Sequence, residues 1–326
     1  MATIRDVARE CGLSISTVSI VLNGKAAERK IPPETVRHVL DTASRLQYRP
    51  NRAARVLRGM TQRPVVALFW VLDNRSTFFM RVVRGLEMVF NDQEAPCDLV
   101  IHPYENGKLR EHEPLLLSGD YDALLIGALS TEDLTYLEGL QPPMPVYLLN
   151  RMSERFPGCS TDPQQIGAAA ADWMLRHGCR KLAFVADREA VVPKTTRRNA
   201  IIAACRERGI LSDDALMVDA PNSISGGMEA ARPILSAGQR PDMIFVDTDV
   251  MALGLSLGLR MRDVTDIPML CIALNHPDLD RHLSPTLSLI DIPGERIGRE
   301  SAMQVRDLLY HQRALTSVVC QCEMAE

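Results

Sequence analysis

Polar side chains that could orient a small molecule directly follow several apolar segments of this sequence. Asn150 and Arg151 come after V-Y-L-L, and Thr248 and Asp249 follow the segment M-I-F-V-D. Asn275 comes after C-I-A-L. Ligand groups converge at the carboxyl ends of parallel strands, where amides, hydroxyls and charged groups fix a ligand by hydrogen bonds. The pattern therefore predicts ligand binding at these positions. Alternatively, some of these residues are ordinary polar residues of loops.

Catalytic and metal-binding patterns are weak by comparison. The segment H-P-D-L-D-R-H places His276, Asp278, Asp280 and His282 at alternating positions, but we expect a loop there, without a helix to hold a metal site. The sequence contains no G-x-G-x-x-G, no P-loop and no G-x-S-x-G motif. We therefore predict no catalytic residues, no metal and no cofactor.

A different chemistry is suggested near the N-terminus, where hydroxyl groups cluster on one short segment. Ser14 is a good N-cap for a helix from Ile15 to Asn23. At 100° per residue, Val18, Val21 and Leu22 point to one side, and the opposite arc carries Ser16, Thr17, Ser19, Ile20 and Asn23. Hydroxyl groups can contact base edges in the major groove, and Ile20 could contact a thymine methyl group. Alternatively, Ile20 is an ordinary exposed isoleucine.

The surrounding elements are those that would present this helix to DNA. Ile4, Val7, Ala8 and Cys11 lie on one face of a preceding helix that Gly12 ends, which makes a helix-turn-helix pattern. A third helix begins near Pro33, with a core stripe of Val36, Val39, Leu40, Ala43 and Leu46. Asn51 can cap a short basic helix from Arg52 to Arg58 that carries Leu57. This helix is either a solvated linker or a segment that folds on DNA and inserts a leucine wedge.

The charge distribution divides the chain at about Arg63. The 326 residues have a net charge of -4, but residues 1–63 carry +7 and the remainder carries -11. A basic head on an acidic body is typical of a nucleic-acid-binding module fused to another domain. The longest apolar run has eight residues, too short to cross a membrane, and the first ten residues lack the apolar stretch of a signal peptide. With eight cysteines and no CxxC pair, we expect a cytoplasmic protein with reduced thiols.

The body from Pro64 onward alternates buried-strand patterns with helical patterns. A first series runs from the strand V-V-A-L-F-W-V-L to P-V-Y-L-L-N, and a second begins with a helix from Ile166 to Arg176 and ends at P-M-L-C-I-A. This alternation predicts parallel sheets covered by helices on both faces. Two series indicate two lobes with a ligand cleft between them.

The head resembles the LacI/GalR family of bacterial transcription regulators. The similarity covers residues 3–58, from T-I-R-D-V-A through S-I-S-T-V-S-I-V-L-N-G to E-T-V-R-H-V-L, Y-R-P-N and A-R-V-L-R. It implies a homodimer on a pseudo-palindromic operator in double-stranded DNA. The DNA-contacting residues implied are Thr3, Ser14, Ile15, Ser16, Thr17, Ser19, Ile20, Asn23, Tyr48, Asn51, Ala54, Leu57 and Arg58. Ile20 stands where family members usually carry Arg or His, and Arg52 replaces a common proline.

The body resembles the effector domain of the same family, which shares its fold with periplasmic sugar-binding proteins. Matching stretches include H-G-C-R-K-L-A-F-V and P-D-M-I-F-V-D-T-D-V-M-A-L-G. The expected fold is α/β: a small all-α helix-turn-helix domain (1–49), a hinge helix and linker (50–63), and a two-lobe periplasmic-binding-protein-like domain with parallel sheets (64–326). Lobe one is expected at about 64–161 and 291–317, and lobe two at about 162–290.

The resemblance implies an effector site between the lobes. Its residues would be Phe78, Phe79, Asn150, Arg151, Arg197, Thr248, Asp249 and Asn275. Asn150 and Asn275 stand where relatives often place an aspartate, while Arg197 keeps a positive charge. A sugar-like or anionic small metabolite is expected, and the arginines favour the anion.

Three functional hypotheses follow from the sequence. The leading one is a ligand-responsive transcription regulator, most simply a repressor. The alternatives are a small-molecule-binding module without a DNA role, against which the basic head argues, and a two-lobe enzyme, for which no catalytic pattern is present.

Overall fold

The computed structural model describes residues 4–22, 26, 29, 31–46, 63–71, 76–188, 192–210, 216–238, 240–275 and 287–325. The head consists of three helices, α1 (Ile4–Cys11), α2 (Ile15–Leu22) and α3 (Pro33–Arg45). Ser14 caps α2 as expected, because its Oγ accepts a hydrogen bond from the backbone N–H of Thr17 at 3.0 Å. Gly12, with φ of 65°, makes the left-handed turn that separates α1 from α2.

The three helices of the head enclose a small apolar core. Its buried members are Val7, Ala8, Val18, Val21, Val39 and Ala43. The prediction that Leu40 belongs to this core is wrong, since Leu40 is 49% exposed. Val39 and Ala43 define the face of α3 that points into the core. Leu40 follows Val39 and is therefore rotated by about 100° away from that face. Thr42 is buried on that face instead.

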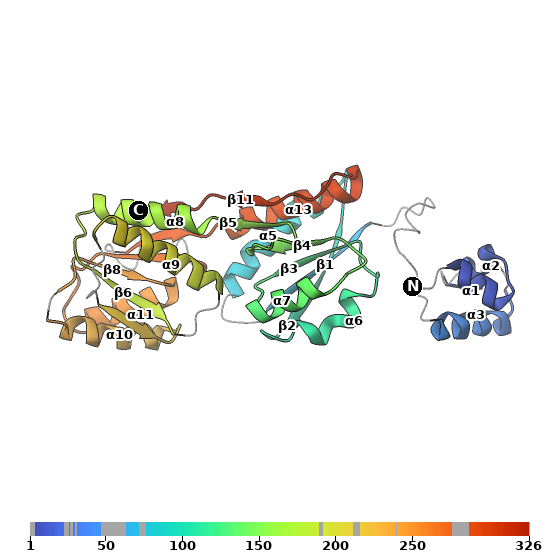
Figure 1. Cartoon of the computed structure of the whole chain (residues 1–326), viewed down its shortest axis with the longest axis horizontal. Helices are drawn as coiled ribbons and strands as arrows, with labels where there is room; N and C mark the ends of the chain where they lie inside the picture. Colours follow the sequence, from blue (N-terminus) through green and yellow to red (C-terminus); the bar gives the residue numbers. More distant parts are fainter. Residues whose placement is uncertain are drawn as a thin grey trace.

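The body contains two six-stranded sheets, one in each lobe (Figure 1). The first sheet has the order β11-β5-β4-β3-β1-β2, and its described strand pairs are all parallel. Its strands are β1 (Val65–Val71), β2 (Asp98–Tyr104), β3 (Ala123–Gly127), β4 (Val146–Leu149), β5 (Gly158–Thr161) and β11 (Val318–Cys320). Central strands such as β1 are buried on both faces, which explains their unbroken apolar sequences.

The second sheet has the order β12-β10-β9-β8-β6-β7. Its strands are β6 (Leu182–Asp187), β7 (Met217–Ala220), β8 (Met243–Val246), β9 (Met269–Ala273), β10 (Leu287–Asp291) and β12 (Glu323–Ala325). The edge strand β12 is antiparallel to β10, and the other pairs are parallel. The sequence pattern did not predict β5 of the first sheet.

Helices cover both sheets, and these two parallel-dominated layers establish the expected α/β fold. The first lobe carries α5 (Ser76–Phe90), a 3-10 turn (Leu109–His112), α6 (Glu113–Leu116), α7 (Thr131–Gly139) and α13 (Gly294–His311). The second lobe carries α8 (Pro163–Arg176), α9 (Val192–Glu207), α10 (Ile224–Ser236) and α11 (Asp249–Arg260). The sequence pattern of residues 109–117 predicts one helix, but the structure has two short helical segments there. The chain forms a 3-10 turn and restarts as α6, because Pro114 in its first turn has no N–H to continue the ladder.

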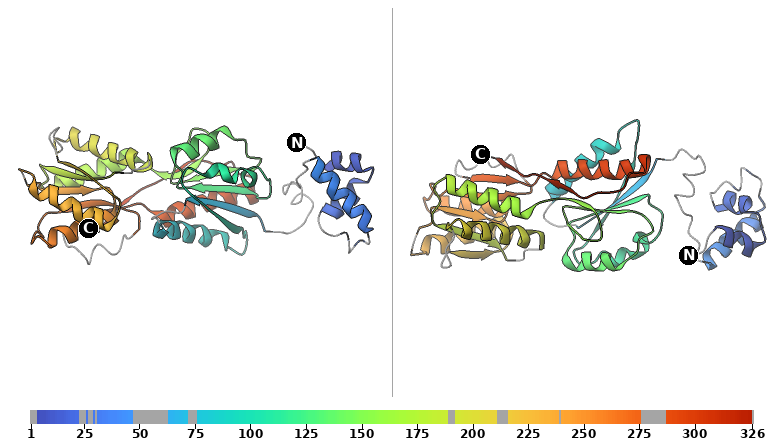
Figure 2. Two further views of the ribbon diagram at one scale, coloured as in Figure 1. Left: turned by 90° about the horizontal axis from the view of Figure 1, so that it is seen from below. Right: turned by 45° about the horizontal axis from the view of Figure 1, so that its top comes forward.

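After β10 the chain returns from the second lobe to the first and forms α13. This helix packs directly against α5, and Figure 2 shows the two lying side by side. This contact depends on two glycines. A Cβ atom on Gly85 would lie 2.0 Å from the carbonyl oxygen of Glu295, and one on Gly298 would lie 2.1 Å from that of Val82. Only glycine fits at these two positions, because a side chain would collide with the backbone of the facing helix.

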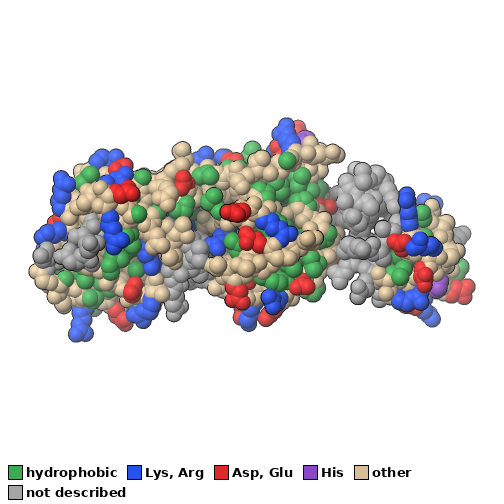
Figure 3. Space-filling model, viewed as in Figure 1, with side chains coloured by type: hydrophobic (Ala, Val, Ile, Leu, Met, Phe, Trp, Pro, Cys, Tyr) green, Lys and Arg blue, Asp and Glu red, His purple; other side chains and the backbone are tan. Residues whose placement is uncertain are grey.

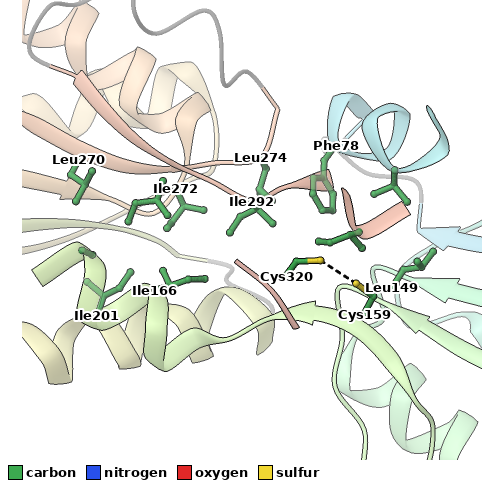
Figure 4. Packing of buried hydrophobic residues seen from close by; sticks show 14 of the residues in the cluster. Phe78, Leu149, Cys159, Ile166, Ile201, Leu270, Ile272, Leu274, Ile292 and Cys320 are labelled. Atoms are coloured by element: carbon green, nitrogen blue, oxygen red, sulfur yellow. Dashed lines mark hydrogen bonds between the residues drawn. The ribbon is translucent and has the colours of Figure 1, made fainter. Parts of the chain in front are cut away.

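One apolar cluster runs continuously through the junction of the lobes (Figure 4). It includes Leu149 and Cys159 from the first sheet and Ile166, Leu270 and Ile272 from the second lobe. The thiol sulfurs of Cys159 and Cys320 lie 3.4 Å apart within it. Burial of such side chains stabilises by about 25 cal/mol per Å² of apolar surface, so the cluster joins the lobes as well as supporting each one.

No helix among the described residues is both long enough and apolar enough to cross a membrane. Charged side chains of both signs are scattered over the face of the two lobes seen in Figure 3.

Candidate functional site: an interlobe pocket and a DNA-facing helix

A cavity of about 210 Å³ opens where the two lobes meet. Asn150, Arg151 and Met152 line it from the turn after β4, and Ser160 and Thr161 line it from β5. The second lobe contributes Pro163 from α8 and Thr196 and Arg197 from α9. The structure thus brings together three of the predicted effector-site residues, Asn150, Arg151 and Arg197.

The turn after β4 depends on the conformation of Asn150. Its φ is 53°, in the left-handed region that asparagine tolerates better than most residues. Its backbone N–H donates to the carbonyl oxygen of Cys159 at 2.7 Å, which fixes the turn against β5. Asparagine at this position therefore has a backbone role in directing the chain into Arg151.

Arg151 is a buried cation in the wall of the cavity. Arg151 is 8% exposed, and its Nε has no hydrogen-bond partner among the described residues. Burial lowers the pKa of the Arg151 guanidinium, and the charge of Glu138 opposes that change. A guanidinium stays protonated in a protein, so a positive charge is buried here with its hydrogen-bonding capacity incompletely used.

Arg197 faces the same cavity from α9, and two ion pairs fix this helix to the second sheet. Lys194 Nζ donates to Asp187 at 2.6 Å, and Arg198 Nε donates to Asp247 at 2.9 Å. Both carboxylates are nearly inaccessible to solvent. Burial raises the pKa of Asp247, and the neighbouring Arg198 opposes the rise. Because Lys194 and Arg198 lie on either side of Arg197 in sequence, these contacts fix the part of α9 that carries Arg197.

The other polar residues predicted on the second lobe form a separate hydrogen-bonded group. Thr248 caps α11 and donates from Oγ1 to Asn222 at 2.8 Å. Asp249 accepts from the backbone N–H groups of Leu274 and Asn275, at 3.2 and 2.7 Å. The Oδ1 atom of Asn275 is buried without a partner among the described residues. Asp249 therefore holds the backbone of Asn275, and Asn275 is not among the described residues that line the cavity, so its contact with an effector stays a prediction.

The predicted aromatic pair lies apart from the residues that line the cavity. Phe78 is 1% exposed and packs against Trp70, with ring centroids 6.1 Å apart. Phe79 is half-buried and lies 5.4 Å from the Trp70 ring. Neither phenylalanine is among the described lining residues, and their contact with an effector stays a prediction.

Helix α2 has the predicted two-sided character. Val18 and Val21 are buried, Ser16 is exposed and Ile15 is 42% exposed, while Thr17, Ser19 and Ile20 are half-buried. The predicted contacts Thr3, Asn23, Tyr48, Asn51, Ala54, Leu57 and Arg58 lie outside the described residues. The side chain of Leu22, predicted to face the core, is likewise not described.

No group of three or more His, Cys, Asp or Glu side chains that could hold a metal ion occurs within the described part of the chain. The H-P-D-L-D-R-H segment falls outside it.

Comparison with known proteins agrees with both parts of this architecture. Residues 161–324 match the periplasmic binding protein-like domain, and residues 3–51 match the lacI family of bacterial regulatory proteins. The chain belongs to the LacI family. Catabolite control protein A of Priestia megaterium, a relative by sequence, is 27% identical over 312 residues, which cover 91% of this chain and 89% of the relative.

Two solved structures extend the comparison to the fold of this LacI-family chain. A LacI family transcription regulator from Clostridium acetobutylicum superposes with a TM-score of 0.74 at 25% identity, covering 81% of this chain and 99% of its own. The lac repressor dimer, bound to operator and the anti-inducer ONPF, has a TM-score of 0.68 at 18% identity and covers 100% of this chain and 98% of its own. At 18% identity, the similarity to the lac repressor shows a shared fold only.

Five residues of the cavity were not found by sequence reasoning: Met152, Ser160, Thr161, Pro163 and Thr196. Ser160 and Thr161 belong to β5, whose sequence G-C-S-T has no apolar run to mark it as a strand. One sequence signal could have located this region, namely Asp162 as the N-cap of α8. Its carboxylate accepts a hydrogen bond from the backbone N–H of Gln164 at 2.8 Å, and the residues just before such a cap lie in the preceding connection or strand end.

Proposed function

We propose that this chain is a ligand-responsive, sequence-specific transcription regulator, most simply a repressor, that binds a pseudo-palindromic operator as a homodimer. The observation that carries the proposal is the combination of a helix-turn-helix head, with exposed Ser16 on its second helix, and a two-lobe body with a cavity between the lobes. The second helix of such a motif enters the major groove, where side chains contact base edges. A chain that acts on operator DNA works in the cytoplasm.

The residues proposed to contact the effector are Phe78, Phe79, Asn150, Arg151, Arg197, Thr248, Asp249 and Asn275, of which Asn150, Arg151 and Arg197 line the cavity. The cavity combines donors from both lobes, so a small sugar-like or anionic metabolite within it would favour one relative position of the lobes. A ligand shifts such an equilibrium only through its different affinity for the two states.

Dimer formation is supported by apolar side chains left on the surface of both lobes. The edge strand β2 exposes Val100 and Ile101, and the second lobe exposes Ile224, Leu257 and Met261. Leu257 and Met261 are four residues apart at the end of α11 and therefore share one face of that helix, and a shared exposed apolar face is the kind of surface that an interface covers. A single three-helix head contacts only one half-site, so two heads held by a dimer would supply the specificity.

The test is selection of double-stranded DNA from a random pool by the full chain, with sedimentation to measure its mass in solution. We expect the enriched sequences to contain an inverted repeat and the protein to sediment as a dimer. A monomer that enriches no sequence at low salt would instead favour the small-molecule-binding module without a DNA role.

A further inference from the structure

Two cysteine thiols lie in contact where the chain passes between the lobes (Figure 4). Cys159 belongs to β5, which leads into α8 of the second lobe, and Cys320 ends β11, which leads into β12 of the second sheet. Their sulfur atoms lie 3.4 Å apart, although 161 positions separate the two residues in sequence. The thiols therefore bring two connections between the lobes together at one point.

The pairing of β5 with β11 holds the two thiols on one face of the first sheet. The strands are parallel, with Val318 opposite Cys159 and Cys320 opposite Thr161. Alternate residues of a strand share a face, so Cys159 and Cys320 are diagonal neighbours on the same side. The sulfur atoms of a disulfide lie about 2.05 Å apart, so these two need to approach by about 1.4 Å. Because β11 is the edge strand of its sheet, it can shift without breaking the pairing to a second neighbour.

The two thiols differ in their readiness to react. Cys159 is fully buried and Cys320 is 2% exposed. The hydrogen bond between them raises the pKa of Cys159, and burial raises it further. The same hydrogen bond lowers the pKa of Cys320, burial opposes this change, and the charge of Arg296 on α13 supports it. The thiolate is the nucleophilic form of cysteine, so Cys320 is the attacking sulfur and Cys159 keeps its proton.

A third thiol nearby is less suited to this chemistry. Cys322 follows Cys320 by two residues and is partly exposed, but burial raises its pKa to about 12. Burial likewise raises the pKa of Cys97 and Cys205 to about 12 and that of Cys179 to about 11. Protonated thiols react slowly with oxidants. Cys320 is therefore distinguished from these cysteines by its environment as well as by its close partner.

We propose that Cys159 and Cys320 form a reversible disulfide in response to a hydroperoxide, and that this bond ties together the two connections that carry them. The Cys320 thiolate attacks the O–O bond of hydrogen peroxide, which breaks to leave a sulfenic acid on Cys320 and a hydroxide ion. That hydroxide takes up the proton that Cys320 had released and becomes water. The sulfur of Cys159 then attacks the Cys320 sulfur, the S–S bond forms as the S–O bond breaks, and the leaving hydroxide takes the Cys159 proton as a second water. Two thiols are thus oxidised and one peroxide is reduced, and a small thiol reverses the reaction by exchange.

The position of the pair makes both its access and its effect depend on the junction of the lobes. Thr161 shares a face with Cys159 and lines the cavity between the lobes, so a molecule as small as hydrogen peroxide has only this side chain to pass. Once the disulfide has formed, the segment from β5 to α8 and the segment from β11 to β12 can no longer slide past one another. Oxidation is therefore expected to restrict movement of one lobe against the other.

The first experiment treats the reduced full chain with hydrogen peroxide and maps the product by mass spectrometry of a digest made without reduction. We expect the chain to lose the mass of two hydrogen atoms and to yield a peptide that joins Cys159 to Cys320, and dithiothreitol should restore both thiols. A disulfide that uses Cys322 instead would overturn the proposal. So would irreversible oxidation of Cys320 without a cross-link, or thiols that react only after the chain unfolds.

Variants separate the roles of the two sulfurs. Cys320→Ala should form no cross-link and should slow the reaction of Cys159 with peroxide by about tenfold or more, because the attacking thiolate is removed. Cys159→Ala should stop at the sulfenic acid on Cys320, which dimedone labels once the treated chain is unfolded. Cys97→Ala is the matched control, since Cys97 is a buried cysteine of the same lobe and its removal should leave the cross-link unchanged. Equal reaction of Cys159 in the parent chain and in Cys320→Ala would refute the assignment.

Hydrogen exchange tests the effect on the connections between the lobes. Backbone amides of β5 and β11 should exchange more slowly in the oxidised parent chain than in the reduced one, and peroxide-treated Cys159→Ala should show no such slowing. Unchanged exchange in the oxidised parent chain would overturn the claim that the bond ties the connections together. Both measurements are made without DNA, so a failure here leaves the proposed function standing, and a chain that binds no DNA leaves the disulfide standing.

Discussion

Arg81 of α5 joins the two lobes through a bidentate ion pair with Asp291 at the end of β10. Its two terminal nitrogens donate to the two carboxylate oxygens at 2.9 and 2.7 Å, and one of them also donates to the carbonyl oxygen of Leu274 at 3.0 Å. Both charged side chains are 19% exposed. The pair thus connects the first lobe to the two strand ends, of β9 and β10, that lie beside Asn275.

Removing this pair should loosen the junction. Asp291→Asn leaves Arg81 partly buried without its counter-ion, and we expect a loss of about 1–3 kcal/mol in the free energy of unfolding. Asp266→Asn is the control, because its pair with Arg240 is exposed (57% for the arginine and 70% for the aspartate) and should change stability by less than about 0.5 kcal/mol. Urea unfolding of both variants checks this. Equal stabilities would mean that the interlobe pair contributes nothing.

The ion pair between Arg198 and Asp247 should hold α9, and with it Arg197, in place. We expect Asp247→Asn to destabilise the chain by about 2–4 kcal/mol, because a buried guanidinium loses its partner. Hydrogen exchange of backbone amides in α9 should become faster. Asp172→Asn, which removes the more exposed partner of Arg208 at the other end of α9, serves as the matched control. Unchanged exchange in Asp247→Asn would show that α9 is held by its apolar contacts alone.

The long elements of this protein are predictable from sequence, and the shortest ones are not. The runs of β1 and β6 are buried on both faces, so continuous apolar residues identify them. β5 pairs with the preceding strand β4 and with the distant β11, and its sequence G-C-S-T carries no apolar run of its own. Elements whose structure is decided by distant partners leave little local signal.

The candidate site divides in the same way. Arg151 follows the end of β4, a position where ligand groups converge, whereas Arg197 lies within α9 and was implied by the family resemblance. Asp249 was equally conspicuous, yet it accepts hydrogen bonds from the backbone of the neighbouring strand end, a role that depends on the register of β8 and β9. The types of residue near the strand ends therefore indicated where the site lies, but not what each side chain does there.

Leu57 tests the role of the hinge segment predicted from sequence. Leu57→Ala should weaken operator binding by about tenfold or more, since it removes the apolar wedge expected to enter the minor groove. The stability of the two lobes should not change, because Leu57 precedes both of them in the sequence. Leu40→Ala is the control, as Leu40 is an exposed leucine of the head. Fluorescence anisotropy with the selected duplex measures the difference, and equal affinities would exclude the wedge.

Low pH should lower the stability of the first lobe through protonation of His102. Burial, and next the charge of His112, lower the pKa of His102 below its usual 6.5, and its Nε2 lies 2.7 Å from the Tyr121 hydroxyl oxygen. The unfolded chain then binds the proton more readily, so the stability contribution is present above about pH 6.5 and is lost as pH falls through the lower folded value. His102→Gln should reduce the fall in melting temperature between pH 7 and pH 5 by about one or two degrees. The exposed His311→Gln should leave it unchanged, and a steeper fall in His102→Gln would contradict this reading.

The most direct test of the whole account is the affinity of the full chain for its selected duplex as a function of salt concentration. A dimer whose basic heads contact several phosphates predicts a steep, linear fall in the logarithm of the binding constant with the logarithm of salt concentration. Ser16→Ala should lower the affinity for the selected sequence while leaving that slope nearly unchanged, since Ser16 is expected to contact bases. Absence of binding at low salt, or an affinity indifferent to both salt and sequence, would contradict the assignment of this protein as an operator-binding regulator.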